Sequence, residues 1–355
     1  MSARNKLAAN VFSEIETRTS ATGSNPSPTL ASITPTLSPI TPPFISQWVE
    51  GAGLHTNKKS RLRLTPADQN EGVSFSLAFQ GNAYAAPALW TRLSATSRST
   101  SLVLRGPTRR RFELKTVEHL MAALFAAGLP NLRVDIEDLH SAEEADPQAD
   151  VIELPVLDGS ARDWMPHARL VMNAQVARAV WIPVRSFEIS DGSRGVLIAP
   201  WADGALTTEF QCAVEFGAHW AQQKTFVFDW TRVEESFHQF AAEIASARTF
   251  GFQHELDELA RKGLARGGTF DNALLLDGDR VCNQGGFRVE QELAAHKLLD
   301  AVGDFALLGS PILGSIRLTR AGHSIHLRAL EEAVRQGALV KGWIDNRGRI
   351  QREPL

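Results

Sequence analysis

The order of the predicted elements repeats along the chain, and this repetition restricts the fold more than any other feature. From residue 47, short stretches such as VSFSLAF at 73–79 alternate apolar and polar side chains, as a half-buried strand requires. A predicted helix, VEHLMAALFAAG at 117–128, follows them and leads to a strand at 131–139. The second block begins near Ala179, again with strands, and has predicted helices at 231–245, 255–262, 291–305 and 323–336. Two blocks in which strands precede helices predict an α+β protein with two topologically similar domains.

The first 43 residues differ from the rest, because SATGSNPSPTLASITPTLSPITPP is rich in Ser, Thr and Pro and poor in large apolar side chains. Such a segment buries too little apolar surface to offset the entropy of ordering, so we expect a disordered leader at 1–43. The first domain is then expected at 44–174, the second at 175–345 and a C-terminal tail at 346–355. The acidic stretch SAEEADPQAD at 141–150 is expected to be a solvated loop.

Composition excludes several classes of function. The chain carries 37 Lys and Arg against 40 Asp and Glu, a net charge of -3, whereas binding to nucleic acid or to an anionic membrane favours a basic excess. No run of about 18 apolar residues is present, so no membrane-spanning helix is expected. The two cysteines, Cys212 and Cys282, are too few for a disulfide framework or a thiolate metal site. We therefore expect a cytoplasmic protein in which any metal ion is held by His and carboxylate side chains.

The predicted helix at 291–305 has an unusual polar side. At 100° per residue, four polar side chains fall within about a third of its circumference, namely His296, Lys297, Asp300 and Asp304. An imidazole and a carboxylate at i and i+4 can reach one divalent metal ion, with Asp304 as a supporting or proton-relay group. For this stretch taken alone, a solvated helix face is the commoner alternative.

A second polar pair stands at the start of the predicted helix at 117–128. We expect Thr116 to cap this helix, so that Glu118 and His119 lie in its first turn, where the helix dipole favours a carboxylate. His119 could complete a metal-binding set with His296 and Asp300, and three protein ligands leave open the position that a hydrolytic zinc needs for water. Glu118 could then act as a base. Taken alone, a Glu-His pair at a helix start is more often a surface feature.

Two further side chains could carry catalytic roles. His323, in RAGHSIHLRAL, follows Gly322 at a helix start and could protonate a leaving group, with Asp304 holding it protonated. Thr249, in SARTFGF, lies at a loop and could hydrogen-bond a developing oxyanion. By position alone, His323 is more often a capping or core histidine and Thr249 an ordinary turn residue. The glycine-rich GLARGGTFDNA lacks the Lys-Ser/Thr ending of a phosphate-binding loop.

Seven motifs, in this order, resemble those of one family. They are GAGLHTNKK, KTVEHLMAAL, ELPVLDGSA, SARTFGF, GLARGGTFDNA, HKLLDAVGD and AGHSIHLRAL. Together they resemble the UDP-3-O-acyl-N-acetylglucosamine deacetylases, zinc amidases that commit sugar nucleotide to lipid A synthesis. The resemblance covers nearly everything after residue 45. It implies two similar α+β domains that form a layered sandwich, with helices packed between two outer sheets and the site at their junction.

The resemblance also implies a zinc ion and the residues that hold it. His119, His296 and Asp300 match the zinc ligands of the family. Glu118 matches the general base that activates the metal-associated water. The cofactor expected for this chain is therefore Zn2+.

Four other residues match the family in the region around the metal. His323 matches the general acid, and Asp304 matches the charge partner of that histidine. Thr249 matches the residue that supports the tetrahedral oxyanion, and Lys297 the one that reaches towards substrate. These roles rest on the resemblance.

An apolar passage for the acyl chain is implied as well. The residues in the matching stretch are Phe250, Leu256, Ala265, Thr269, Asn272 and Leu275. Two positions depart from the family pattern. Asn57 stands where a glycine is usual, and Ala199 stands where a basic residue often serves the nucleotide side of the substrate.

The expected function is zinc-dependent removal of acetate from the 2-acetamido group of UDP-3-O-acyl-N-acetylglucosamine. The substrate would be a small amphiphilic nucleotide sugar, and the enzyme a monomer without a nucleic-acid partner or stable membrane insertion. Ala199 and the acidic loop leave open a related zinc deacetylase that acts on a different N-acetylated sugar or nucleotide sugar. A catalytically silent sugar-nucleotide-binding relative is a third hypothesis, although such a protein has no chemical need for the complete set of polar residues.

Overall fold

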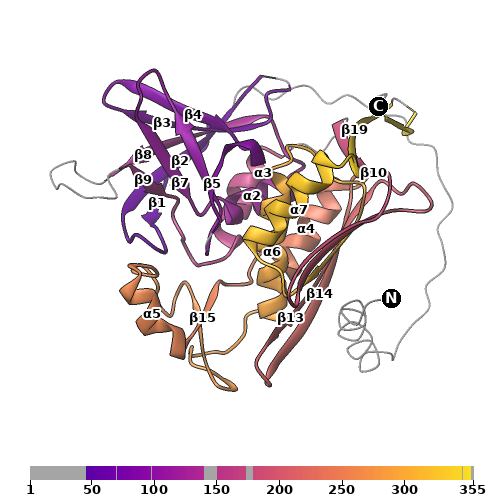
Figure 1. Ribbon diagram of the computed structural model, residues 1–355. Coiled ribbons are helices and arrows are strands. Elements are labelled where there is room, and N and C mark those ends of the chain that lie inside the picture. Colours follow the sequence, from indigo (N-terminus) through magenta and orange to yellow (C-terminus); the bar gives the residue numbers. More distant parts are fainter. Residues whose placement is uncertain are drawn as a thin grey trace.

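A computed structural model describes residues 45–68, 70–96, 98–139, 150–172, 179–345 and 347–352. The leader expected at 1–43 and nearly all of the acidic loop at 141–150 lie outside these residues. The described chain is a mixed α/β structure in which helices are gathered between sheets (Figure 1). Among the described helices, none has both the length and the apolar character needed to cross a membrane.

The first sheet is built from residues 49–153. Its strands are β1 (Val49–Ala52), β2 (Lys59–Pro66), β3 (Val73–Phe79), β4 (Asn82–Pro87), β5 (Leu93–Ala95), β6 (Ser101–Arg105), β7 (Arg111–Lys115), β8 (Leu132–Asp138) and β9 (Val151–Glu153). They are arranged in the order β1-β2-β8-β3-β4-β6-β7-β9, with β5 paired to β6. The pairs β3–β8 and β7–β9 are parallel, and the other described pairs are antiparallel. Alternation in β3 buries Phe75 and Leu77 and leaves Ser74 and Ser76 half-buried, so one face of this sheet covers a core.

The second large sheet comes from the second half of the chain. Its order is β11 (Phe187–Asp191), β12 (Arg194–Pro200), β18 (Gly314–Thr319), β13 (Thr207–Phe216) and β14 (Trp220–Asp229). Two small sheets accompany it, β10 (Ala179–Pro183) with β19 (Leu339–Ile344) and β20 (Ile350–Arg352), and β15 (Phe250–Phe252) with β16 (Leu274–Asp277) and β17 (Arg280–Val281). The sheet of β15, β16 and β17 belongs to the segment that lines the candidate site.

The described helices are α2 (Glu118–Ala126), α3 (Met165–Leu170), α4 (Val233–Glu243), α5 (Leu256–Arg261), α6 (Glu292–Ala306) and α7 (His323–Arg335), with 3-10 turns at Trp90–Arg92, Arg162–Trp164 and Gln253–Glu255. The central helices α2 and α6 are almost wholly buried, whereas α5 lies apart from them and is mostly exposed (Figure 1). Helix α2 packs against α6, and α6 packs in turn against β13, β14 and α7. In Figure 1, α2, α6 and α7 lie between the first sheet and the pair β13–β14. The first half of the chain therefore meets the second half along α2 and α6.

One glycine allows α2 and α6 to approach closely. A Cβ atom at Gly303 would lie 2.0 Å from the backbone oxygen of Glu118 and 2.9 Å from its Cα atom. No side chain fits at that distance, so glycine is required at this point of α6. The close contact brings Glu118 and His119 directly against the polar residues of α6.

The helices agree with the sequence predictions better than the strands do. The helices predicted at 231–245, 255–262, 291–305 and 323–336 correspond to α4, α5, α6 and α7. Strands β4, β5, β9, β14, β15, β17 and β19 and the short helix α3 were not predicted. Eight of the ten β14 residues are half-buried or exposed, and they include Gln and Lys, so the strand conformation is decided by pairing with β13. Strand β20 lies in the range predicted as a tail, where it pairs with β19.

The prediction that Thr116 caps α2 is wrong. Val117 occupies the cap position, and no side chain caps this helix end. The backbone of Thr116 has a φ of 59°, and its Oγ1 donates a 2.8 Å hydrogen bond to Oε1 of Glu153. The Glu153 carboxylate also accepts hydrogen bonds from the backbone N–H groups of His55 and Thr56. The Thr116 hydroxyl group therefore donates its hydrogen bond to a buried carboxylate and does not cap the helix.

Candidate metal centre and active-site cavity

Helix α6 is enclosed by protein on nearly every side. Of its residues from Glu292 to Ala306, only Lys297 is not buried. Asp304 is 0% exposed and Asp300 2% exposed, which rules out a solvated helix face. Buried carboxylates are costly unless neighbouring groups compensate their charge, so the partners of these two side chains define the site.

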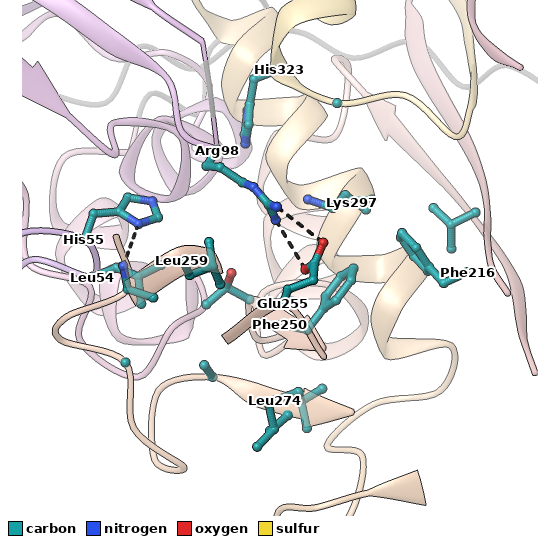
Figure 2. Close-up of a pocket in the computed structure, with 18 of the residues that line it drawn as sticks. Leu54, His55, Arg98, Phe216, Phe250, Glu255, Leu259, Leu274, Lys297 and His323 are labelled. Carbon is teal, nitrogen blue, oxygen red and sulfur yellow. Dashed lines mark hydrogen bonds and ion pairs between the residues drawn. The ribbon is translucent and has the colours of Figure 1, made fainter. Parts of the chain in front are cut away.

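A cavity of about 1130 Å³ opens beside α6 (Figure 2). Three of the predicted polar residues line it, namely Thr249, Lys297 and His323. Five of the residues expected in the acyl passage line it as well, namely Phe250, Leu256, Ala265, Thr269 and Leu275. Asn272 does not line the cavity. It is buried, and its side chain donates to the backbone oxygen of Gly267 at 2.9 Å and accepts from the backbone N–H of Thr269 at 2.8 Å, so it supports the loop behind the wall.

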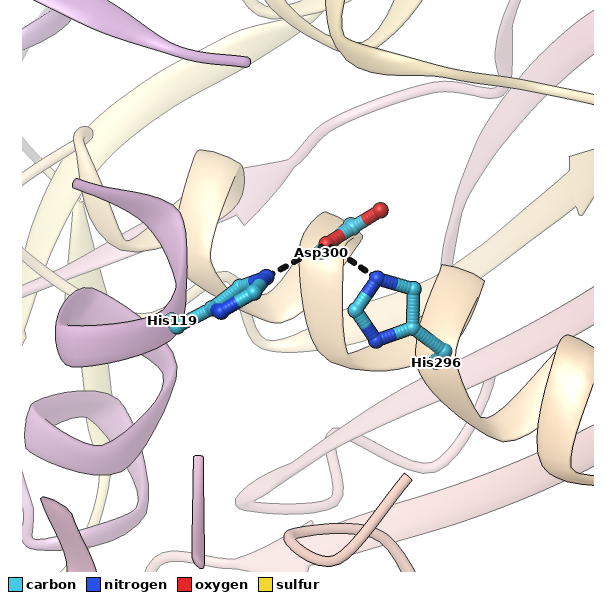
Figure 3. Close-up of side chains that lie close together, drawn as sticks. All are labelled: His119, His296 and Asp300. Carbon is cyan, nitrogen blue, oxygen red and sulfur yellow. Dashed lines mark ion pairs between the residues drawn. The ribbon is translucent and has the colours of Figure 1, made fainter. Parts of the chain in front are cut away.

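Three buried side chains from α2 and α6 converge beside this cavity (Figure 3). Nε2 of His119 lies 3.6 Å from Oδ1 of Asp300, and Nε2 of His296 lies 3.4 Å from the same oxygen. One ligand atom from each of the three residues can be chosen so that all lie within 4.8 Å of one another. A tetrahedral metal ion with bonds of about 2.0–2.1 Å separates its ligand atoms by about 3.3–3.4 Å. The set therefore fits a small divalent cation.

Neighbouring groups orient His296 and Asp300, whereas the buried Nδ1 of His119 has no hydrogen-bond partner among the described residues. Nδ1 of His296 lies 3.1 Å from the backbone oxygen of Ala247, which leaves Nε2 to face Asp300 and His119. Burial lowers the pKa of His296 to about 3, so its ring is neutral and its Nε2 lone pair is free to bind a metal. Nζ of Lys297 donates to Oδ2 of Asp300 at 2.9 Å and leaves Oδ1 directed at the imidazoles. Such supporting contacts are typical of metal ligands.

Glu118 is the first residue of α2 and is 3% exposed. The backbone N–H of Thr100 donates to its Oε2 at 3.0 Å, and its Oε1 lies 3.8 Å from Nε2 of His323. Burial raises the pKa of Glu118 to about 7, although the charges of His323 and His119 oppose the rise. A carboxyl group with a pKa near neutrality can both accept and release a proton, as a general base must.

His323 opens α7 and contacts carboxylates on both sides of its ring. Its Nδ1 lies 2.9 Å from Oδ2 of Asp304, and its Nε2 lies 3.8 Å from Oδ2 of Asp300. Burial alone would lower the pKa of His323, but the charge and hydrogen bond of Asp304 raise it to about 9. Burial would raise the pKa of Asp304, but the charge of His323 and the hydrogen bonds lower it to about 2. At neutral pH the pair is an imidazolium and a carboxylate, which can donate a proton from Nε2.

Thr249 lies on the cavity wall immediately before β15. Its backbone N–H donates to the oxygen of Gly159 at 2.7 Å, and its own oxygen accepts from the N–H of Leu274 at 2.8 Å. Gly159 has a φ of +80°, and a Cβ there would lie 1.6 Å from the backbone oxygen of Asn272. These contacts fix the Thr249 backbone on the cavity wall, from which its hydroxyl group can donate to a bound ligand.

Sequence analysis did not single out three polar residues of this site. Thr100 binds Glu118 through its backbone N–H and donates from Oγ1 to Asp304 at 2.5 Å. Nδ1 of His326 lies 2.9 Å from Oδ2 of Asp304. His55 lines the cavity, and its buried Nε2 has no hydrogen-bond partner in the described chain. The motifs GAGLH and HSIH contain the two histidines, whereas Thr100 carries no local signal because its partners are distant in sequence.

Arg98 and Glu255, which both line the cavity, form an ion pair (Figure 2), with nitrogen and oxygen atoms 3.3 and 3.4 Å apart. The glycine-rich loop packs on the GAGLH loop. The N–H of Gly267 donates to the oxygen of Leu54 at 3.0 Å, and a Cβ at Gly267 would lie 2.3 Å from the oxygen of Gly53. The glycine therefore serves close packing of two loops.

Cationic side chains line the cavity, although residue 199 is an alanine and not one of them. Ala199 lies on β12, where it pairs with Ser315, and it does not line the cavity. Arg98, Arg194 and Arg320 do line it. Three guanidinium groups therefore line the cavity despite Ala199, with Arg98 paired to Glu255 and Arg320 to Glu215.

Comparison with known proteins identifies similar sequences over most of the chain. Residues 46–335 match the UDP-3-O-acyl N-acetylglycosamine deacetylase family. A UDP-3-O-acyl-N-acetylglucosamine deacetylase of Syntrophotalea carbinolica is 34% identical over 286 residues, which cover 80% of this chain and 84% of that protein. Proteins of the same name from Saccharophagus degradans and Myxococcus xanthus are 32% and 31% identical, over 81% of this chain and 87% and 83% of their own lengths. The matched range includes every site residue described above.

Proposed function

The chain belongs to the UDP-3-O-acyl N-acetylglycosamine deacetylase family, and from this premise we propose that it hydrolyses the N-acetyl group of UDP-3-O-acyl-N-acetylglucosamine. The reaction releases acetate and leaves a free amine, and it commits the sugar nucleotide to lipid A synthesis. The observation that carries the proposal is a buried cluster in which a carboxyl group with a pKa near 7, a histidine–carboxylate pair and a metal-binding set lie together beside a large cavity.

The proposed metal ion is zinc, with His119, His296 and Asp300 as its ligands. Two imidazoles and a carboxylate are ligand types of catalytic zinc sites, and a set of three leaves one position open. Zinc bound there would polarise the acetamido carbonyl group and lower the pKa of water. Lys297 would keep Oδ1 of Asp300 directed at the metal, because it holds Oδ2 at 2.9 Å.

The protein side chains would move the protons. The Glu118 carboxylate takes a proton from water as the water oxygen bonds to the acetamido carbon. Negative charge then develops on the former carbonyl oxygen, where the Thr249 hydroxyl group donates a hydrogen bond. As the C–N bond breaks, Nε2 of His323 gives its proton to the departing nitrogen, and Asp304 keeps the ring oriented. Oε1 of Glu118 and Nε2 of His323 lie 3.8 Å apart, beyond hydrogen-bonding distance, so one bridging water would have to carry the proton taken from water to the histidine before the next turnover.

The cavity is proposed to hold the rest of the substrate. Its apolar wall would receive the acyl chain, with the passage residues Phe250, Leu256, Ala265, Thr269 and Leu275 on it. Asn272 would shape this passage from behind by holding the loop at 267–269. Lys297 and the guanidinium groups of Arg98, Arg194 and Arg320 would attract the diphosphate, since cationic groups in a cleft concentrate anionic ligands.

We further propose that residues 44–174 and 175–345 are two similar domains in a layered sandwich. The packing of α2 from the first half against α6 from the second supports this division. The enzyme is proposed to act as a monomer in the cytoplasm, without nucleic acid or stable membrane insertion. Sedimentation analysis of the purified protein and fractionation of cells would test these statements.

Acetate release from purified, zinc-loaded protein tests the proposed function. We expect UDP-3-O-acyl-N-acetylglucosamine to be deacetylated much faster than UDP-N-acetylglucosamine, and Glu118→Gln to keep its zinc while losing activity. A zinc-loaded wild type that releases no acetate from the acylated substrate would overturn the proposal. Turnover of a different N-acetylated sugar would instead support a related deacetylase, and ligand binding without any turnover would support a silent relative.

A further inference from the structure

Asp304 is contacted by a second histidine to which the proposed mechanism gives no role. Nδ1 of His326 lies 2.9 Å from Oδ2 of Asp304, the same oxygen that lies 2.9 Å from Nδ1 of His323. The two rings come from the first turn of α7, and their centroids are 6.3 Å apart. His326 is 1% exposed, so its imidazole has been removed from water. A buried polar group of this kind is costly unless it is hydrogen-bonded, and Asp304 supplies that partner.

The hydrogen bonds around Asp304 fix which atoms carry protons. The carboxylate can only accept, so both histidines must donate from Nδ1. Burial lowers the pKa of His326 despite its hydrogen bond to Asp304, so this ring is a neutral donor. On the other side of the carboxylate, Oδ1 accepts from Oγ1 of Thr100 at 2.5 Å. The carboxylate is therefore held at Oδ1 by the first half of the chain and at Oδ2 by α7.

We propose that His326 is a positioning residue whose Nδ1–H fixes the rotation of the Asp304 carboxylate, so that Oδ2 faces His323. The inference rests on the proposed function only for the role of His323 as an acid. Without His326, one lone pair of Oδ2 loses its donor, and the carboxylate can turn about its Cβ–Cγ bond. Thr100 then competes for the same atoms, because its Oγ1 also lies 3.2 Å from Nδ1 of His323. His323 loses the contact that aims its Nε2 at the reacting nitrogen.

A matched set of substitutions isolates the donor. His326→Leu removes it from the core without leaving a large cavity. His326→Asn keeps it, because the asparagine amide nitrogen is as many bonds from the backbone as Nδ1. His326→Gln moves the amide nitrogen one bond farther, and it decides the question if His326→Leu does not fold. In full-length, zinc-loaded enzyme we expect kcat to fall about tenfold or more in the Leu and Gln variants, with KM changed by less than about twofold and with Asn restoring most of the rate.

NMR spectroscopy of the histidine side chains provides a test that does not need activity. In 15N-labelled, zinc-loaded protein, the Nδ1–H protons of His323 and His326 should give two downfield signals protected from exchange with water. We expect the His323 signal to shift strongly or disappear in His326→Leu and His326→Gln, and to persist in His326→Asn.

The possible outcomes separate the two proposals. If the wild type releases no acetate, the proposed function fails, and the His323 signal alone decides the role of His326. An unchanged His323 signal in His326→Leu or His326→Gln overturns the inference, even if turnover falls, because the residue would then act only through packing. Failure of His326→Asn to keep the signal overturns it too.

Discussion

The Nε2 atom of His296 lies 3.4 Å from Oδ1 of Asp300, one turn farther along α6. This spacing leaves room for one metal ion between them, and the two side chains are only 1% and 2% exposed. We expect His296→Ala and Asp300→Ala to reduce zinc from about one ion per chain to nearly none and to abolish acetate release. Metal analysis after dialysis measures the first effect. His238→Ala is the matched control, because that imidazole is 64% exposed on α4 and should leave zinc unchanged. A His296→Ala protein that retains one zinc contradicts the ligand assignment.

The pH dependence of the rate follows from two buried groups. Burial raises the pKa of Glu118 to about 7, and Asp304 outweighs burial to raise the pKa of His323 to about 9. Because Glu118 must be ionised and His323 protonated, kcat/KM should rise through the first pKa and fall through the second. The charge of bound zinc lowers both values, so each limb is expected at or below its figure, in the same order. In His323→Ala the rate should drop and the falling limb should vanish. A falling limb that survives this substitution would assign the acid to another group.

Removal of the Thr249 hydroxyl group should slow the chemical step. Thr249→Val keeps the shape of the side chain, and the backbone bonds to Gly159 and Leu274 remain possible. We expect kcat to fall about a hundredfold, the usual effect of losing one oxyanion donor, with little change in KM. Thr249→Ser keeps the hydroxyl group and should stay within about tenfold of the wild type. Equal rates for Val and Ser variants would show that the hydroxyl group does not act in the transition state.

The ligand spacing on α6 could be predicted from sequence, because it is local. A helix places His296 and Asp300 on one side whatever surrounds it, and the first-turn position of Glu118 and His119 follows from where their helix begins. The local pattern could not predict what surrounds these residues in the folded protein. The polar side of α6 has the same sequence whether it faces solvent or protein, and its burial depends on α2 packing against it through Gly303.

Contacts between distant segments were beyond sequence reasoning for the same reason. Thr100 contacts both Glu118 and Asp304, the latter 204 residues away, and nothing near it in the chain marks it as special. Strand β14 was missed because its half-exposed residues take their conformation from β13. Thr116 was assigned to a helix cap because the type of residue fits, whereas a buried carboxylate from Glu153 competes for its hydroxyl group.

A larger side chain in the cavity should discriminate between acyl chains. Leu275 is half-buried on the cavity wall, so Leu275→Trp would occupy space there. We expect kcat/KM for a substrate with a long acyl chain to fall about tenfold or more, a change equivalent to about 1.4 kcal/mol, and that for a short-chain substrate to fall less. Leu275→Met conserves volume and should affect both substrates little. An equal loss of kcat/KM on both substrates would show that Leu275 does not line the acyl-chain passage.

Gly303 tests whether the site depends on the contact between α2 and α6. In Gly303→Ala the new Cβ would lie 2.0 Å from the backbone oxygen of Glu118, so α2 must move away. Overpacking of this kind costs about 1–3 kcal/mol, and the shift also displaces His119 from its fellow ligands on α6. We expect a lower denaturant midpoint together with weaker zinc binding and lower kcat.

Gly195→Ala is the control, because a Cβ there meets only the oxygen of Ile189, at 3.8 Å. If Gly303→Ala unfolds at the wild-type midpoint and binds zinc as tightly, the ligands do not depend on the distance between the two helices. If stability falls while zinc affinity is unchanged, the structural adjustment occurs outside the first turn of α2, and His119 stays in position to bind the metal.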